Sequence, residues 1–271
     1  MQTSTIIKTE AITLRIAPFS NTSHIVTWLT PHHGKTATVI KGACRPKSPV
    51  FGQYDIGFLC ELLFYARNHN GLHIVKECST IDSRRICRGN WQITSAISYL
   101  CHLAAIATPD GAHAPELYSL LASALTQVTT APHLNSILFQ FELQLLKILG
   151  ISPQLNNCTS CRTKTNRHQN LYFSATAGGV LCAPCHALSH PPDTLNISGS
   201  TLALLQRRQS STKLHAVKGI PDSTTTQNQI QYLLGSFLTY HIDLSPTSRS
   251  ITYQTANIPK SSTSIPLASP K

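Results

Sequence analysis

The sequence has little charge, and acidic residues are the scarcer kind. Charged residues make up 12% of the 271 residues, and 22 Lys and Arg outweigh 11 Asp and Glu, which gives a formal net charge of +11 at pH 7. Soluble domains usually have about 25% charged residues, so surface ion-pair networks are scarce here and most cations lack acidic neighbours. A basic excess of this size favours a polyanionic partner, either nucleic acid or an anionic membrane surface.

Long apolar runs are also missing. No run approaches the roughly 18 residues of a membrane span. The first ten residues, MQTSTIIKTE, contain neither the basic nor the apolar region of a secretory signal. We therefore expect a soluble, cytoplasmic protein with no membrane partner, which leaves nucleic acid as the favoured polyanion.

Several enzyme motifs are absent. The sequence contains no G-x-x-x-x-G-K phosphate-binding loop, no G-x-G-x-x-G and no G-x-S-x-G. The acids are scattered singly, so no paired-carboxylate centre for metal-dependent nuclease chemistry is visible. The adjacent His32 and His33 are typical of a polar turn. We therefore predict that the protein is not an enzyme, with a zinc hydrolase as the least favoured alternative.

The first 80 residues have the alternating pattern of strands. Five short strands are predicted around residues 12–16, 24–30, 35–40, 54–65 and 72–77, and an Asn-His-Asn-Gly turn at 68–71 joins the last two. The fourth strand is the clearest, since apolar residues occupy one parity from Ile56 to Phe64. Five strands in this length predict a small closed barrel such as the OB-fold, although periodicity alone equally allows an SH3-like barrel.

From about residue 90 the apolar period becomes helical. The spacing predicts helices over 93–104, 115–128 and 135–148, with two more near 200–209 and 226–242. The tail from Leu244 is rich in Ser, Thr and Pro, and we expect it to be disordered.

Four of the nine cysteines form two C-x-x-C pairs separated by 20 residues. The pairs are Cys158 with Cys161 and Cys182 with Cys185, and Gly178-Gly179 just before the second pair allows a tight turn. This spacing is typical of four thiolates that bind one tetrahedral zinc ion. Because all four ligands would be cysteines, no position is left open for water or substrate, and we predict a structural zinc site.

Other interpretations of these cysteines remain open. They are two disulfides, a redox C-x-x-C or an iron–sulfur cluster, although a redox motif would occur once and would open a helix. Three nearby histidines could each replace one cysteine ligand: His168, His186 and His190. The five scattered cysteines are predicted to be small buried hydrophobic residues: Cys44, Cys60, Cys78, Cys87 and Cys101.

A cluster of cations lies between the third and fourth predicted strands. Lys41, Arg45 and Lys47 fall within the segment KGACRPKS, Lys35 lies just upstream, and the surrounding stretch from residue 11 to 54 contains no acid. Two prolines should keep this segment extended, so its cations could follow the phosphates of a single strand. Three aromatic residues could stack on bases: Trp28, Phe51 and Tyr54. The alternative is a solvated basic loop without a partner.

These elements predict an α+β protein. We expect an N-terminal five-stranded OB-fold over residues 1–80, which would bind nucleic acid. A helical domain over 81–243, with a four-cysteine zinc-binding element inserted at 156–190, should follow it. The tail, 244–271, completes the chain.

The order of these features resembles the bacterial RecO family of DNA-repair recombination mediators. The most specific match is Gly34-Lys35 followed by Lys41–Ser48, and Leu14–Ser20 and His24–Thr30 also agree. Further matches are Leu62–Tyr65, Phe139–Pro153 and the two cysteine pairs with Gly178-Gly179. The resemblance spans about residues 5–245.

The resemblance implies a function and partners. Family members bind single- and double-stranded DNA, anneal complementary strands, engage the single-strand-binding protein and, with RecR and sometimes RecF, help to load RecA. A member would lie in the cytoplasm, associated with the nucleoid. By the match, the four cysteines are zinc ligands, and the candidate DNA-contacting residues are Lys35, Lys41, Arg45 and Lys47.

The sequence departs from the family pattern at two places. Asn21 to His24 stand where acidic and basic residues are usual, and Cys44 stands where a basic residue is common. Some family members lack the cysteines, so zinc would support the fold without being required for the activity. The alternative function is a zinc-ribbon adaptor that acts mainly through protein–protein contacts.

Overall fold

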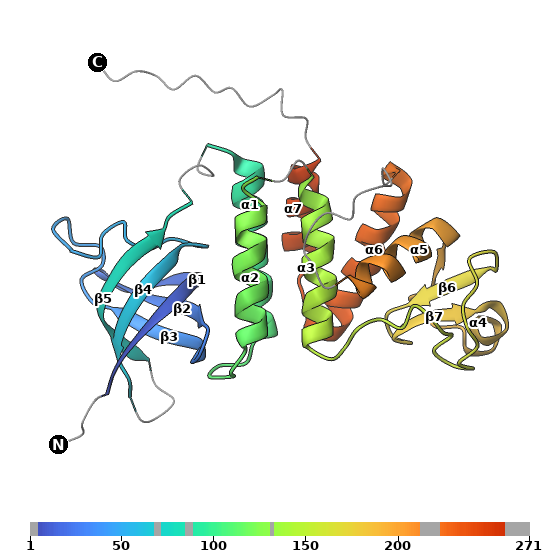
Figure 1. The fold of residues 1–271 in the computed structure, drawn as a ribbon, viewed down its shortest axis with the longest axis horizontal. Helices are drawn as coiled ribbons and strands as arrows, with labels where there is room; N and C mark the ends of the chain where they lie inside the picture. Colours follow the sequence, from blue (N-terminus) through green and yellow to red (C-terminus); the bar gives the residue numbers. More distant parts are fainter. Residues whose placement is uncertain (1–4, 68–71, 85–88, 131–132, 212–222, 258–271) are drawn as a thin grey trace, which may run out of the picture.

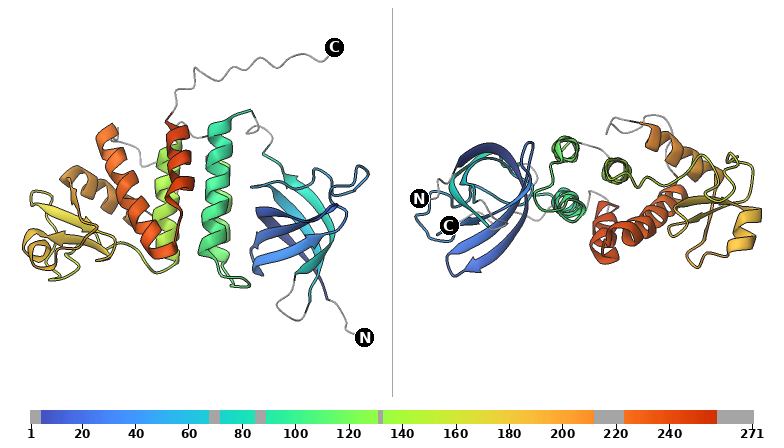
Figure 2. Two further views of the ribbon diagram at one scale, coloured as in Figure 1. Left: turned by 180° about the vertical axis from the view of Figure 1, so that it is seen from behind. Right: turned by 90° about the horizontal axis from the view of Figure 1, so that it is seen from below.

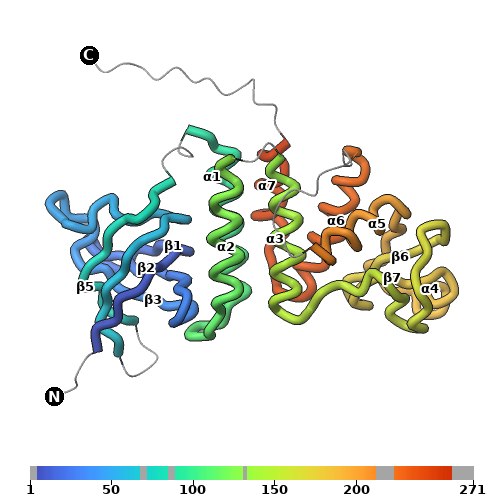
Figure 3. Tube along the Cα trace, in the orientation of Figure 1, coloured from blue at the N-terminus to red at the C-terminus, as the bar shows by residue number. Residues whose placement is uncertain are grey.

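The computed structural model describes residues 5–67, 72–84, 89–130, 133–211 and 223–257. Figure 1 shows three parts in a row, with a β-barrel at one end, upright helices in the middle and a small sheet with a short helix at the other end. The views in Figure 2 and the tube in Figure 3 show the same succession.

The barrel is closed by five strands. They are β1 (Ile6–Ser20), β2 (Ser23–Thr30), β3 (Gly34–Ile40), β4 (Leu59–Tyr65) and β5 (His73–Asp82), in the order β1-β2-β3-β5-β4. The long β1 closes the barrel because its first half pairs with β4 and its second half with β2. β3 and β5 pair in parallel, whereas the other neighbours are antiparallel. This topology confirms the predicted OB-fold and removes the SH3-like alternative.

The interior of the barrel explains the strand pattern. Along β4 buried and half-buried residues alternate, as expected for a strand with one face toward a core. Trp28 is completely buried in this core, and its indole N–H donates to the Thr38 hydroxyl at 2.8 Å. That bond removes the penalty of burying an indole N–H without an acceptor.

The helices and the barrel share a second hydrophobic core. Its helices are α1 (Trp91–Ala107), α2 (Pro115–Gln127) and α3 (Leu134–Ile148), which confirm the three predicted helices. Ile12, Leu14 and Leu29 of the barrel belong to the same buried cluster as the helix faces. The barrel is therefore packed directly onto α1.

The C-terminal part continues this core into the small sheet. Its sheet contains β6 (Leu171–Ser174), β7 (Gly179–Cys182) and β8 (Leu195–Ile197), in the order β7-β6-β8. Its helices are α4 (Ala183–Ser189), α5 (Gly199–Ser210) and α6 (Thr224–Ile242), and the last two confirm the helices predicted there. In the described part of the chain, no helix is long and apolar enough to span a membrane.

A final helix replaces the start of the expected disordered tail. α7 spans Pro246–Ala256, so the prediction of disorder from residue 244 is wrong for this segment. Its composition is rich in Ser and Thr, but Tyr253 and Arg249 are buried and α7 packs along α1. The remainder of the predicted tail, 258–271, lies outside the described residues.

A buried polar cluster explains why α7 is held in place. Arg249 forms two bonds to the Glu142 carboxylate of α3, at 2.8 and 2.9 Å. The Tyr99 and Tyr253 hydroxyls donate to the same carboxylate at 2.6 and 3.0 Å. Burial, together with this carboxylate, holds the pKa of both tyrosines well above the ordinary value, so they stay neutral donors. The cluster joins α1, α3 and α7 through one carboxylate.

Candidate metal centre and nucleic-acid interface

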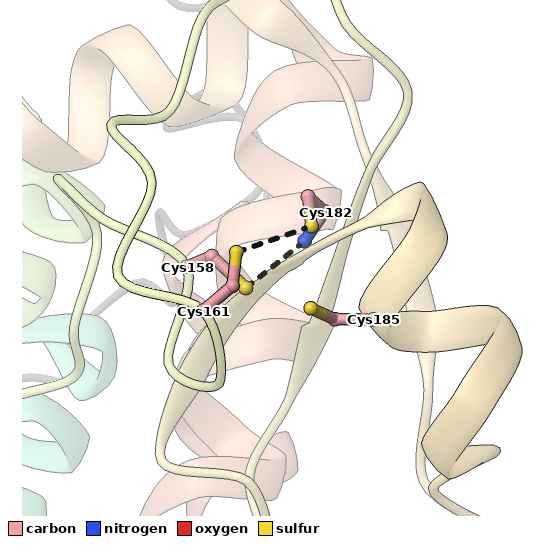
Figure 4. Close-up of side chains that lie close together, drawn as sticks. All are labelled: Cys158, Cys161, Cys182 and Cys185. Carbon is pink, nitrogen blue, oxygen red and sulfur yellow. Dashed lines mark hydrogen bonds between the residues drawn. The ribbon is translucent and has the colours of Figure 1, made fainter.

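The two cysteine pairs meet at the end of the molecule opposite the barrel. Cys158 and Cys161 lie on a tight turn after α3, Cys182 is the last residue of β7, and Cys185 lies in α4. Figure 4 shows the four side chains close together, and their Sγ atoms lie within 4.8 Å of one another. A tetrahedral zinc ion with Zn–S bonds of about 2.3 Å separates its sulfurs by about 3.8 Å. The Sγ atoms of Cys161 and Cys182 are 3.7 Å apart, so the residues fit a metal of this size.

Main-chain contacts set this arrangement. The Thr159 N–H donates to the Val180 carbonyl at 2.9 Å, which ties the first turn to β7. Gly179, at φ +151°, lies so close to Gln154 that an added Cβ would be 2.2 Å from its carbonyl oxygen. The Gly-Gly dipeptide expected to ease the second turn therefore also allows the two segments to touch.

Hydrogen-bond donors favour the thiolate at Cys158 and Cys161. The Thr163 hydroxyl and backbone N–H lower the pKa of the Cys161 thiol to about 6. Burial opposes ionisation of Cys158, but the backbone N–H groups of Cys182, Cys161 and Ser160 lower its pKa nevertheless. The backbone of Cys185 favours a Cys182 thiolate, yet burial and the neighbouring sulfurs raise its pKa to about 12. A cation among the sulfurs would offset this mutual repulsion.

The disulfide alternative is weaker in this geometry. The four cysteines are free, and the 3.7 Å separation of Cys161 and Cys182 is far longer than a disulfide bond of about 2.05 Å. Among the described residues, the group consists of the four predicted cysteines alone, and the alternative in which a histidine replaces one of them has no support. His186 instead stacks on Tyr172, with ring centroids 3.9 Å apart.

The basic segment lies at the end of β3. Lys41, Arg45 and Lys47 are exposed, and within the described part of the chain none of the three forms an ion pair. The prediction that prolines keep this segment extended is wrong, because residues 41–53 form consecutive turns. Ala43 and Val50 are buried in the barrel core and anchor the turns. We call residues 41–53 the basic loop.

Lys35 lies at the other end of β3 and in different surroundings. Its ammonium is 3.0 Å from the Asp110 carboxylate and donates to the Ala105 carbonyl at 2.9 Å. Its side chain is only 14% exposed. The structure therefore does not bring Lys35 together with the basic loop, and its DNA contact stays a prediction that competes with a role in joining barrel and helices.

The candidate stacking residues differ in exposure. Trp28 is 0% exposed and cannot stack on a base, whereas Phe51 is 64% exposed on the basic loop. Tyr54 is half-buried, and its hydroxyl lies 2.7 Å from His24 Nδ1. Only Phe51 of the three predicted candidates therefore presents an accessible ring.

Cys44 also differs from its prediction. It is exposed, 3.2 Å from His24 Nε2, whereas Cys60, Cys78 and Cys101 are buried as expected. Sequence reasoning missed the contact because β2 supplies His24 and the basic loop supplies Cys44, with no motif linking them. The fifth scattered cysteine, Cys87, lies outside the described residues.

Two family models match this chain, one over the barrel and one over the helical part. Residues 1–84 match the family model described as "Recombination protein O N terminal", and residues 88–250 match "Recombination protein O C terminal". The chain belongs to the RecO family. The predicted resemblance to this family of DNA repair proteins is thereby confirmed.

Individual RecO proteins are similar over most of their length. The DNA repair protein RecO of Syntrophus aciditrophicus is 28% identical, with 88% of this chain and 92% of that protein covered. The DNA repair protein RecO of Bacillus pumilus is 29% identical over 74% of this chain and 76% of its own length. That of Bacillus subtilis is 27% identical, with 73% and 75% covered.

Proposed function

We propose that this RecO-family protein is a recombination mediator that binds single- and double-stranded DNA and anneals complementary strands. The observation that carries the proposal is the basic loop, which presents Lys41, Arg45 and Lys47 without acidic partners among the described residues. The phosphate backbone supplies most of the affinity in non-specific nucleic-acid binding. Three exposed cations on one loop therefore suit a backbone contact that does not depend on base sequence.

The positive charge of the basic loop also accounts for annealing. Two complementary strands repel each other, and a protein that neutralises phosphates on both lowers that repulsion. No catalytic residue is required for this step, which is consistent with a mediator that is not an enzyme. Phe51, on the same loop, is positioned to stack on an unpaired base.

The cysteine group has a structural role in this proposal. Zinc, when bound by Cys158, Cys161, Cys182 and Cys185, would cross-link the turn after α3 to β7 and α4. Because all four groups are thiols, the set offers no open coordination position for chemistry. Arg162 and Lys164, which are exposed near the cysteines, add cations at this end of the molecule.

We extend the proposal to partners by family membership. With RecR, and in some settings RecF, the protein would help to load RecA onto DNA that is coated by the single-strand-binding protein. This work would take place in the cytoplasm at the nucleoid. The proposal is tested by strand annealing on coated single-stranded DNA with and without RecR, where we expect RecR to change the rate.

The contact itself is tested by salt dependence. We expect the triple variant Lys41→Gln, Arg45→Gln, Lys47→Gln to flatten the slope of log affinity against log salt by about 2, since three single-strand contacts contribute about 0.7 each. The control replaces three exposed lysines elsewhere, Lys8, Lys76 and Lys147, of which the first two form surface ion pairs. Its slope should stay at the wild-type value. Equal slopes for both variants would remove the basic loop from the interface.

The same assay separates the alternative function. A zinc-ribbon adaptor that works through protein–protein contacts would not bind a short oligonucleotide below about 100 micromolar at moderate salt. Tight, salt-dependent binding by the wild type would exclude that alternative.

A further inference from the structure

A hollow of about 790 Å³ lies where the barrel meets the connection between α1 and α2. The barrel contributes the β2–β3 turn and the nearby ends of β3, β4 and β5, on the side of the barrel that faces the foot of α1 and α2 in Figure 1. The charged and titratable side chains on its described lining are His32, His33, Lys35, Arg67, His73, Asp110 and His113. We call this feature the histidine hollow.

The walls of the hollow are held together by close contacts. Gly34 has φ +61°, and a Cβ there would lie 1.8 Å from the carbonyl oxygen of Ala112. The Gly111 N–H donates to the Lys35 carbonyl at 3.0 Å, and the Lys35 ammonium pairs with Asp110 at 3.0 Å. The β2–β3 turn and the α1–α2 connection therefore touch through backbone, so the hollow is preformed.

Basic side chains outnumber acidic ones on the described lining of the hollow. Asp110 is the one acid on the described lining, and Lys35 already offsets it. Beyond this pair, the charged and titratable side chains of that lining are Arg67 and four imidazoles. Burial is the main cause of the lowered pKa of His73, and the nearby Arg67 and His33 lower it further.

The floor of the hollow is aromatic. The Phe64 ring, which is 1% exposed, lies 5.1 Å from the ring of His73 and 6.4 Å from that of His33. The Arg67 backbone N–H donates to His73 Nδ1 at 3.1 Å. Neutral His73 therefore has its proton on Nε2, where it is a hydrogen-bond donor. Donors and cations above an apolar floor suit an anion that is partly desolvated.

We propose that the histidine hollow is a second, pH-dependent binding site for a phosphate group of the nucleic-acid strand. The inference rests on the proposed DNA-binding function and adds a contact to it. The hollow and the basic loop lie at opposite ends of β3, whose seven residues span about 20 Å. A single strand of nucleic acid that leaves the basic loop and runs along β3 therefore reaches the hollow.

The pH dependence comes from the residue type. Histidine is the side chain that ordinarily changes charge between pH 5 and 8, so lowering the pH adds positive charge to the hollow. Lysine and arginine stay charged over this range, so the contribution of the basic loop is constant. Binding should therefore strengthen as the pH falls from 8 to 6, and the gain should depend on salt.

The test measures binding of a labelled single-stranded oligonucleotide at pH 8 and pH 6 across a salt series. The variant is His33→Gln with His113→Gln, two exposed residues on opposite walls. The matched control is His102→Gln with His133→Gln, two exposed histidines that are absent from the lining. We expect the wild-type and control slopes to steepen at pH 6, with up to about 1.4 of the change coming from His33 and His113 at about 0.7 each. The hollow variant should lose this steepening and keep its pH 8 affinity.

Two further arms identify the source of the phosphate. An oligonucleotide with a 5′ phosphate is compared with the same sequence ending in a hydroxyl, and inorganic phosphate is added at constant ionic strength. A gain restricted to the phosphorylated end supports a terminal phosphate, and an equal gain supports a phosphate within the strand. Suppression of the gain by inorganic phosphate supports the same anion site in either case.

The inference is overturned if the hollow variant steepens like the wild type, or if the control loses the effect to the same extent. Normal binding at pH 8 with either of these results leaves the proposed function intact. Absence of wild-type binding at both pH values overturns the proposed function and this inference together.

Discussion

The buried ion pair between Glu142 and Arg249 gives the sharpest prediction about stability. Glu142 is 0% exposed, and Arg249 supplies both of its charged contacts, at 2.8 and 2.9 Å. Replacing Arg249 by Met keeps a long side chain in place but leaves a buried carboxylate with tyrosine hydroxyls as its remaining donors. Loss of one partner of a buried pair usually costs about 3–5 kcal/mol. We expect the free energy of unfolding to fall by that amount.

The double variant tests whether the unpaired charge is the cause. Burial opposes the charge of Arg249, but Glu142 more than compensates, so the pKa of the guanidinium is raised and Arg249 stays charged in the folded protein. Replacing both, by Glu142→Gln with Arg249→Met, removes the isolated carboxylate. We therefore expect the double variant to be more stable than Arg249→Met alone, since replacing both members of a buried pair is often close to neutral.

Urea denaturation followed by far-UV circular dichroism measures these differences. Lys147→Met is the control, because Lys147 is exposed on the same helix as Glu142 and should change stability by less than about 0.5 kcal/mol. The slope of the transition should remain equal among the variants, as expected if they unfold the same structure. The reasoning is refuted if Arg249→Met lies within about 1 kcal/mol of the wild type, or if the double variant is the less stable of the two.

Three further predictions follow from other contacts. Gly34→Ala should lower the free energy of unfolding by about 3 kcal/mol or more, because its Cβ would overlap the backbone of the α1–α2 connection. Gly52→Ala has no atom within 4 Å of its added Cβ and should cost only about 1 kcal/mol, from its positive φ. Urea titration that ranks the two variants as equally stable would contradict this. Elemental analysis should find one zinc ion per wild-type chain. Removal of the metal by a chelator, or the substitution Cys161→Ser, should lower the melting temperature. An unchanged melting temperature after complete removal of the metal would contradict a structural role. Phe51→Ala should weaken binding of single-stranded DNA by about 1–3 kcal/mol. The control Ile251→Ala, which changes an exposed apolar residue on α7, should leave that affinity unchanged. Anisotropy titrations measure both, and equal affinities for the two variants would exclude stacking by Phe51.

Local patterns in the sequence identified the barrel strands and most helices. In β4 the alternation of large apolar residues directly reflects one face packed on a core. The four cysteines were identified from spacing alone, because a C-x-x-C turn presents two sulfurs whatever surrounds it. The basic loop was found from its charge, but its turns were not, since the anchoring of Ala43 and Val50 in the barrel core has no local signature.

The sequence by itself determined which residue types could do which chemistry: four thiols for a metal and a group of cations for a polyanion. Tertiary structure decided which of them are available. It paired Lys35 with Asp110, buried Trp28, exposed Cys44 beside His24 and ordered α7 around Glu142. It also brought histidines from the β2–β3 turn, β5 and the α1–α2 connection to one hollow. Each of these outcomes depends on contacts between residues far apart in the chain, and such contacts carry no periodicity that a local pattern could reveal.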